Sequence, residues 1–425
     1  MRTAPTMSAA IAATLAATLA ATLAATLAAT LIVTGSAFAQ SDPNLAMNNP
    51  DQQAWTLFLT VNADAKTANN NNALFETWAR DGETFVPNPV WPTTPTPVAA
   101  GERALGLVLQ QAHSGGLLRF AVPGGNATEE TRRNKPDFDF IVANNLYKVS
   151  GLKAAFAANK PLVFPVGALE VKANWVEVSG LRAFNGFTGT PEDAAKIYHV
   201  NSAGGKQYAL VSMHVISKLV PNWTWATFEH KDNPGRCDVI GCKDMFGAQT
   251  PVLPSQSPTE PSRQHYADCV KTPALTAMFA AAHLDPAYVN YCLKGSQTDF
   301  TDTTGLAVRL GNSVTEKFFV NQASCMTCHG RAAFDSTGKP TSFAGFDPIS
   351  INLPLPQNAG NGPIGPINPN WYWIAGGPPS YPVLAGESDI QPIALAADFV
   401  WSIPFCAIDD TANPPETISR FCANK

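Results

Sequence analysis

The run Cys325-Met326-Thr327-Cys328-His329 is the clearest chemical motif in the chain, because it has the form C-x-x-C-H. Two thiols one helical turn apart can take up the two vinyl groups of a haem, and the adjacent imidazole can then bind the iron. The motif therefore predicts a single covalent haem c, attached through Cys325 and Cys328, with His329 as the proximal iron ligand.

Two other uses of paired cysteines fit these residues less well. A structural zinc ion needs two further Cys or His ligands at matched spacing, and the sequence offers no second pair of that kind. A thioredoxin-like dithiol lies between a strand and a helix of a βαβ unit, and the residues that flank Cys325 and Cys328 do not resemble such a unit. Haem attachment remains the favoured interpretation.

The other six of the eight cysteines are an even number, which predicts disulfides in an oxidising compartment. Proximity in the sequence favours three pairs, although sequence alone leaves other pairings open. The favoured pairs are Cys237 with Cys242, Cys269 with Cys292, and Cys406 with Cys422.

Residues 1–39 predict a cleaved signal peptide. Arg2 precedes an uncharged stretch built largely from an Ala-Ala-Thr-Leu repeat, and Ala37-Phe38-Ala39 is a small-x-small cleavage site. A retained membrane anchor and a start at Met7 are the alternatives. Cleavage implies export to the periplasm or the medium of a Gram-negative bacterium, with no membrane span in the mature chain.

Composition narrows the range of partners. Only 14% of the residues are charged, the net charge is −5, and no basic tract is present, so nothing indicates a nucleic acid or an anionic membrane as partner. The chain also contains 35 Pro and 30 Gly, which predict many turns and long connections. We expect a redox partner protein or a small-molecule substrate.

The second axial position of the iron is undetermined, because no Met and no His follows His329. An upstream residue must supply the distal ligand, or the site stays open to a small ligand or substrate. His230 and His214 are the favoured candidates for a haem-pocket or acid/base role, although a His on a strand is more often a structural, hydrogen-bonded residue. The other upstream candidates are His113, His199, His265, His283, Met47, Met213, Met245 and Met278.

Hydrophobic periodicity predicts an α+β fold. Helices are expected from Pro50, after Asn49 as N-cap, and near residues 134–146. Strands are expected over residues 162–178, 196–200, 207–218 and 223–230, the last two forming a hairpin. Residues 40–310 would form a body with a mainly antiparallel sheet and packed helices, and residues 311–425 a loop-rich haem c attachment segment that shares its core.

Seven segments of the chain carry a further likeness: AWTLFLTVN from Ala54, FDFIVANNLY from Phe138, ALEVKANW from Ala168, VSMHVISK from Val211, WTWATFEH from Trp223, SCMTCHGRA from Ser324 and DFVWSIPF from Asp398. Together they resemble a family of large, single-haem bacterial proteins that are described only as cytochrome c family proteins. The likeness runs from about residue 50 to about residue 410 and implies one covalent haem and export, without an established reaction.

Two functional classes follow from these residues. The first is electron transfer through the haem, with a partner docking at its edge. The alternative is a haem enzyme, of peroxidase or oxygenase type, whose open distal site lies against the upstream body. Arg331 is near enough to the motif to contact a haem propionate, and Trp371-Tyr372-Trp373 could line the haem edge or anchor the long loop over residues 351–382.

Overall fold

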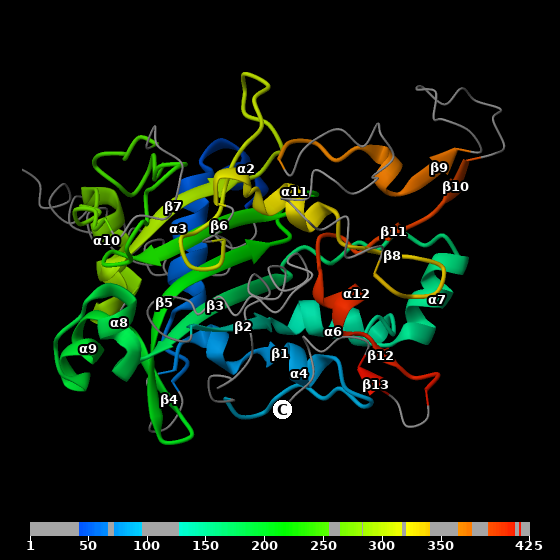
Figure 1. Cartoon of the computed structure of the whole chain (residues 1–425), viewed down its shortest axis with the longest axis horizontal. Coiled ribbons are helices and arrows are strands. Elements are labelled where there is room, and N and C mark those ends of the chain that lie inside the picture. Colours follow the sequence, from blue (N-terminus) through cyan, green and yellow to red (C-terminus); the bar gives the residue numbers. More distant parts are fainter. Residues whose placement is uncertain are drawn as a thin grey trace, which may run out of the picture.

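The structure is a computed structural model that describes residues 42–66, 72–95, 127–254, 264–282, 284–316, 320–340, 364–375, 390–412 and 416–417. Its centre is an antiparallel seven-stranded sheet in the order β1-β2-β3-β5-β6-β7, with β4 paired to the end of β5 (Figure 1). Helices pack around this sheet, so the α+β class with a mainly antiparallel sheet is confirmed. The strands of the sheet are β1 (Ala79–Arg80), β2 (Ala127–Arg133), β3 (Leu169–Glu177), β4 (Val200–Ala203), β5 (Lys206–Ser217), β6 (Thr224–His230) and β7 (Tyr291–Gln297).

The helices and the short strands surround the sheet. The helices are α2 (Pro43–Asn48), α3 (Pro50–Val61), α4 (Asp81–Thr84), α6 (Lys135–Ala143), α7 (Val149–Ala157), α8 (Leu181–Asn185), α9 (Pro191–Ile197), α10 (Pro273–Ala282), α11 (Cys325–Gly330) and α12 (Ser402–Cys406). Three small ribbons pair β8 (Ala333–Phe334) with β11 (Leu395–Ala396), β9 (Trp373–Ala375) with β10 (Ile390–Pro392), and β12 (Ile408–Asp409) with β13 (Glu416–Thr417).

Both predicted helices are present. Helix α3 begins at Pro50, whose fixed φ suits the first helical position, and helix α6 begins after Asn134, whose side chain accepts a hydrogen bond from the Asp137 N–H. A strand expected at residues 196–200 is wrong in its first part, because residues up to Ile197 belong to helix α9. Thr190 and Asp193 form a capping box that starts this helix, and it outweighs the local strand propensity.

The predicted hairpin is also present. Strands β5 and β6 pair antiparallel with Ser212 opposite Glu229, His214 opposite Thr227 and Ile216 opposite Trp225. Directly opposed residues share a face of the sheet, so this register gathers these side chains on one side. The alternation expected along both strands therefore sets the two faces of the sheet.

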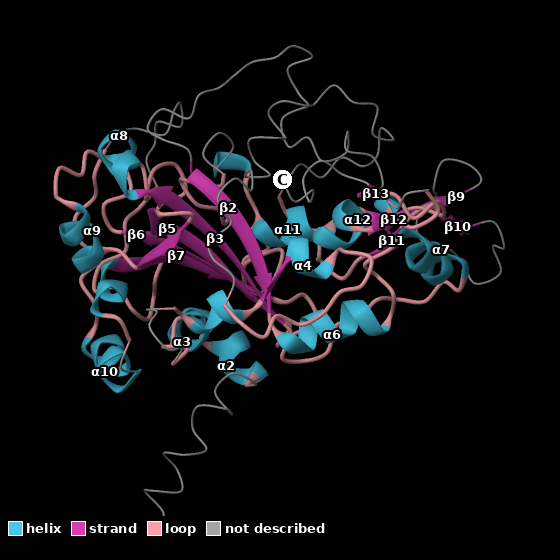
Figure 2. Ribbon diagram, turned by 90° about the horizontal axis from the view of Figure 1, so that it is seen from below, coloured by secondary structure: helices cyan, strands magenta, loops and turns pink. Residues whose placement is uncertain are grey.

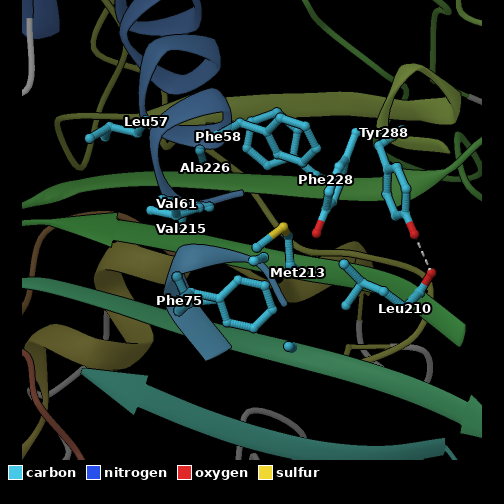
Figure 3. Close-up of a cluster of buried hydrophobic side chains, with 14 of the residues drawn as sticks. Leu57, Phe58, Val61, Phe75, Leu210, Met213, Val215, Ala226, Phe228 and Tyr288 are labelled. Atoms are coloured by element: carbon cyan, nitrogen blue, oxygen red, sulfur yellow. Dashed lines mark hydrogen bonds between the residues drawn. The ribbon is translucent and has the colours of Figure 1, made fainter. Parts of the chain in front are cut away.

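The other face of the sheet is apolar and carries the main core. Helix α3 lies across it (Figure 2), and Phe58 contacts Phe228 at 4.4 Å between ring centroids. Figure 3 shows Met213 and Val215 of β5 pointing into this cluster beside Val61. Burial of these large side chains against α3 holds one face of the sheet closed.

Two disulfides lie at the end of the sheet near β7. They join Cys237 to Cys242 and Cys269 to Cys292, as sequence proximity favours. Cys422, the expected partner of Cys406, lies outside the described residues, as do the predicted signal peptide and His113.

A buried ion pair joins the apolar side of the sheet to the segment before β1. His199 is 1% exposed and donates from Nε2 to Glu76 at 2.9 Å and from Nδ1 to Asp285 at 3.4 Å. Burial alone would lower the pKa of His199, but the Glu76 and Asp285 carboxylates outweigh it and raise this pKa to about 9. The ring is therefore an imidazolium at neutral pH.

We predict that the free energy of unfolding falls by about 3 kcal/mol as the pH rises from 6.5 through 9. The folded-state pKa lies above the ordinary 6.5, so the protonated ring stabilises the fold fully below that value and loses its contribution as the ring deprotonates. Urea unfolding across this range measures the effect. His199→Gln should flatten the slope, and an unchanged slope in this variant would refute the assignment.

Candidate functional site

Helix α11 carries the C-x-x-C-H motif, and contacts from three directions position it against the sheet. Ser324 caps its first turn by accepting from the Thr327 N–H, while Gln297 at the end of β7 accepts from the Met326 N–H at 3.2 Å. A parallel bridge pairs Leu310 with Ser324, so the residue before the motif is also tied to the segment that follows β7. The short helix therefore has a fixed start next to β7.

Cys325 and Cys328 stand one turn apart on α11, and neither is part of a disulfide. Burial raises the pKa of both thiols, that of Cys328 to about 12. Reactive dithiols depend on a lowered thiol pKa, so this environment does not suit thiol–disulfide exchange. Two unpaired thiols on one face of a turn do suit two thioether bonds.

His329 has its ring orientation set by a main-chain carbonyl. Its Nδ1 donates to the Phe399 oxygen at 2.9 Å, which leaves the lone pair on Nε2. Among the described residues no group hydrogen bonds to that Nε2, and the Trp225 ring of β6 lies 4.6 Å from the imidazole, centroid to centroid. Burial lowers the pKa of His329 to about 3, so the ring is neutral. A neutral imidazole with Nδ1 held and Nε2 free is the form that binds iron.

The segment just before α12 closes over the motif. Trp401 donates from Nε1 to the Cys328 oxygen at 3.0 Å, and Ala397 donates its N–H to the Ala332 oxygen at 2.7 Å. With the Phe399 carbonyl, these contacts attach residues 397–401 to the C-terminal half of α11 and to Ala332 just after it.

Arg331 and the aromatic run beyond it also contact this helix. The Arg331 guanidinium lies 5.1 Å from the Trp371 ring, and Trp371 donates from Nε1 to the Arg331 oxygen at 3.1 Å. The Tyr372 hydroxyl donates to the Gly330 oxygen, whereas Trp373 is 41% exposed. Trp371 and Tyr372 thus anchor the chain to the residues that follow His329.

The face of the sheet toward α11 is lined with buried polar side chains in two rows. One row contains Asn174, Ser212 and Glu229, and the next contains Lys172 and His214, each beside its neighbour on the adjacent strand. The loop over residues 312–316 covers both rows. Its Thr315 hydroxyl donates to Asn174 at 2.8 Å, and its Ser313 N–H donates to Glu229 at 3.0 Å. Buried polar groups are stable only when bonded in this way.

His214 lies in the second row, and its tautomer follows from its contacts. The Asn312 Oδ1 accepts from the Val314 and Thr315 N–H groups, so its Nδ2 must face His214 and donates to His214 Nε2 at 3.0 Å. Burial and the charge of Lys172 hold the pKa of His214 well below its usual value. The ring is therefore neutral with its proton on Nδ1.

Two further ionisable groups lie close to His214 and to the motif. Lys172 is 3.2 Å from Glu129, and its positive charge depresses the pKa of both His214 and His329. Glu316 Oε1 lies 3.6 Å from His214 Nε2, and burial raises the pKa of Glu316 to about 7. The polar face thus brings a base, an acid and a cation near the C-x-x-C-H helix.

His230 has a different place from His214. It donates from Nε2 to the Ile197 oxygen at 2.9 Å, accepts on Nδ1 from the Asp232 N–H, and stacks on Tyr198 at 3.8 Å. Adjacent strand residues point to opposite faces, so Glu229 is on the polar face and His230 on the other. The structure therefore brings His214, and not His230, to the side of the motif.

The other upstream candidates do not meet the motif where they are described. Met213 is in the apolar core, His199 pairs with Glu76, and His265, Met47 and Met245 are exposed. Met278 packs on the apolar core, and His283 lies outside the described residues.

Sequence reasoning missed the residues that complete the site. Asn312, Lys172 and Glu316 carry no motif, although the alternation along residues 169–177 would have placed Lys172 on one face with Asn174. Phe399 acts through its main-chain oxygen, and every residue has such an oxygen, so its residue type gives no indication of this role. Only the folded chain identifies it.

Comparisons with known proteins add no relative to this description. No protein-family model matches the chain, and no curated protein or solved structure matches it either. Within the described ranges, no helix is long and apolar enough to cross a membrane. The same ranges contain no group of three or more His, Cys, Asp or Glu side chains arranged to hold a metal ion.

Asn312→Asp should destabilise the protein by about 2 to 3 kcal/mol, because it places a buried carboxylate oxygen against the Nε2 lone pair of His214. Urea unfolding compares this variant with Asn159→Asp, a matched change at an exposed position. The control should stay within about 0.5 kcal/mol of the unmodified protein. Equal stability of the two variants would contradict the network around His214.

Proposed function

We propose that this protein is an exported c-type haemoprotein with a redox function. The observation that carries the proposal is the state of His329, whose Nδ1 is held by the Phe399 carbonyl while no described group hydrogen bonds to Nε2, on a helix that also carries two cysteines outside any disulfide. Cys325 and Cys328 would hold the haem through thioethers and His329 would bind its iron, which supplies one-electron redox chemistry when present. The sequence resemblance to cytochrome c family proteins agrees with this assignment.

Of the two redox classes, the hydrogen bonding of His214 favours an iron whose sixth position lacks a protein ligand over a closed electron carrier. A carrier needs a second axial ligand, and His214, the described candidate on the face of the sheet toward the motif, uses its Nε2 lone pair to accept from Asn312. Lys172 and Glu316 keep 14% and 15% of their side-chain surface accessible, so charged groups remain available to a small polar ligand. His214 and Glu316 can hold or move a proton there.

Electron transfer remains the second candidate. Cys328 and His329 of the motif helix are partly exposed at the protein surface. This exposure suits a docking partner that exchanges electrons at the haem edge. Arg331 and Trp371 lie next to this helix and would contact such a partner or a propionate.

Export from the cytoplasm is consistent with the disulfides and with the proposed haem attachment. The disulfides Cys237–Cys242 and Cys269–Cys292 need an oxidising compartment, and haem c attachment takes place on the same side of the inner membrane. We propose cleavage after Ala39 and a periplasmic or secreted protein.

The purified protein should give a pyridine haemochrome spectrum of a covalently bound haem in a ratio of one haem per chain. Cys325→Ala and Cys328→Ala should each remove one thioether and shift this band, and the double variant should release the haem to acidified organic solvent. Cys237→Ala with Cys242→Ala is the control that changes two thiols and leaves the motif intact. No covalent band in the unmodified protein would refute the proposal.

The ferrous protein should bind carbon monoxide and shift its Soret band. The reason is that His214 Nε2 is already engaged, which leaves the sixth position for an external ligand. Absorption and resonance Raman spectra with and without carbon monoxide measure this directly. Low-spin iron without uptake would reject the open site and favour the electron carrier, and His214→Gln would then show whether this residue is the ligand.

A further inference from the structure

We propose that Asp398, through its buried ion pair with Lys218, is a positioning residue for the proximal ligand and thereby sets the redox equilibrium of the haem. This inference rests on the proposed haem attachment. It gives the segment that begins at Asp398 a role in setting the redox equilibrium. Covalent attachment of the haem does not by itself require that role.

The main chain at this point is in an unfavourable conformation. Asp398 and Phe399 have φ values of 46° and 72°, two successive left-handed residues neither of which is glycine. The left-handed region is uncommon for Asp and costly for a bulky residue such as Phe. Such a turn persists only where surrounding contacts hold it, and here it directs the Phe399 carbonyl at His329 Nδ1.

The Asp398 carboxylate supplies those contacts with both of its oxygens. Oδ1 accepts from Lys218 Nζ at 2.6 Å, and Oδ2 accepts from the Phe164 N–H at 2.7 Å. The Lys218 and Asp398 side chains are only 7% and 8% exposed, so little solvent screens the pair. One carboxylate thus ties the turn to two other segments of the chain.

Lys218 is itself fixed at the end of the β5–β6 hairpin. Its Nζ also donates to the Pro221 oxygen at 2.8 Å and lies 5.7 Å from the Trp223 ring centroid. The same hairpin carries Trp225, whose ring contacts both His329 and Phe399. The sheet, the turn and the imidazole therefore form one connected unit.

The hydrogen bond that this unit maintains determines how strongly His329 donates electrons. A firm Nδ1–H to carbonyl bond raises the basicity of the ring and stabilises the ferric state. If the ion pair between Asp398 and Lys218 is lost, the turn can relax and the hydrogen bond from His329 Nδ1 to the Phe399 carbonyl weakens. The ferrous state is then stabilised relative to the ferric state. The reduction potential should then rise, with no change in the covalent attachment.

Asp398→Asn tests this step, because Asn has the same size and tolerates a left-handed φ, yet its amide offers one acceptor for two donors. We expect the ferric-to-ferrous equilibrium of the holoprotein to shift toward ferrous by at least about tenfold, which is about 59 mV for one electron. The Fe–His stretching frequency of the ferrous protein should fall. Spectroelectrochemistry and resonance Raman spectra measure the two quantities.

Lys218→Met removes the pair from the other side and should give the same shift, which also covers a failure of Asp398→Asn to fold. Lys218→Arg keeps the positive charge, so this variant should have the same reduction potential as the unmodified protein. Glu76→Gln breaks a buried ion pair on the apolar side of the sheet and controls for lost stability, so its potential should not change. An unchanged potential and Fe–His frequency in Asp398→Asn and Lys218→Met would overturn the inference, whereas a lack of covalent haem in the unmodified protein would instead refute the proposed function.

Discussion

The alternation of side chains along β5 and β6 is the constraint on which the rest of the molecule depends. Strand residues point alternately to opposite faces, so one sequence can build an apolar face and a polar face at once. Met213, Val215 and Phe228 point to the α3 side and close the core, while His214 and Thr227 between them point to the motif. A shift of one residue in this register would exchange the two environments and remove both.

The polar face is costly to bury, and the loop over residues 312–316 makes it stable. Asn312, Ser313 and Thr315 satisfy the side chains of His214, Glu229 and Asn174 with direct hydrogen bonds. The parallel bridge between Leu310 and Ser324 ties the residues just before this loop to the residue just before the motif. The C-x-x-C-H helix and the cover of the polar face are thus held close to each other in the candidate site.

The contacts of His329 have a corresponding organisation. His329 takes its orientation from Phe399, and the strained turn at Asp398 and Phe399 is held by Lys218 in the connection between β5 and β6. Strain of this kind is found where a precise arrangement matters more than local stability. The imidazole of His329 is held in one orientation, and the polar network around His214 is hydrogen bonded. Both features suit the proposed haem chemistry, which depends on the basicity of His329 and on the position of the proton on His214.

Sequence by itself determined the features that depend on neighbouring residues. These are the C-x-x-C-H spacing, the caps of α3 and α6, the β5–β6 hairpin with its alternation, and the two disulfides that close short loops. Tertiary structure decided which distant groups meet. The Phe399 carbonyl is 70 residues from His329, and Asn312 is 98 residues from His214, so no local pattern could join them. Tertiary structure also distinguished His214 from His230. Only the sheet register and the covering loop decide which face of the sheet lies toward the C-x-x-C-H motif.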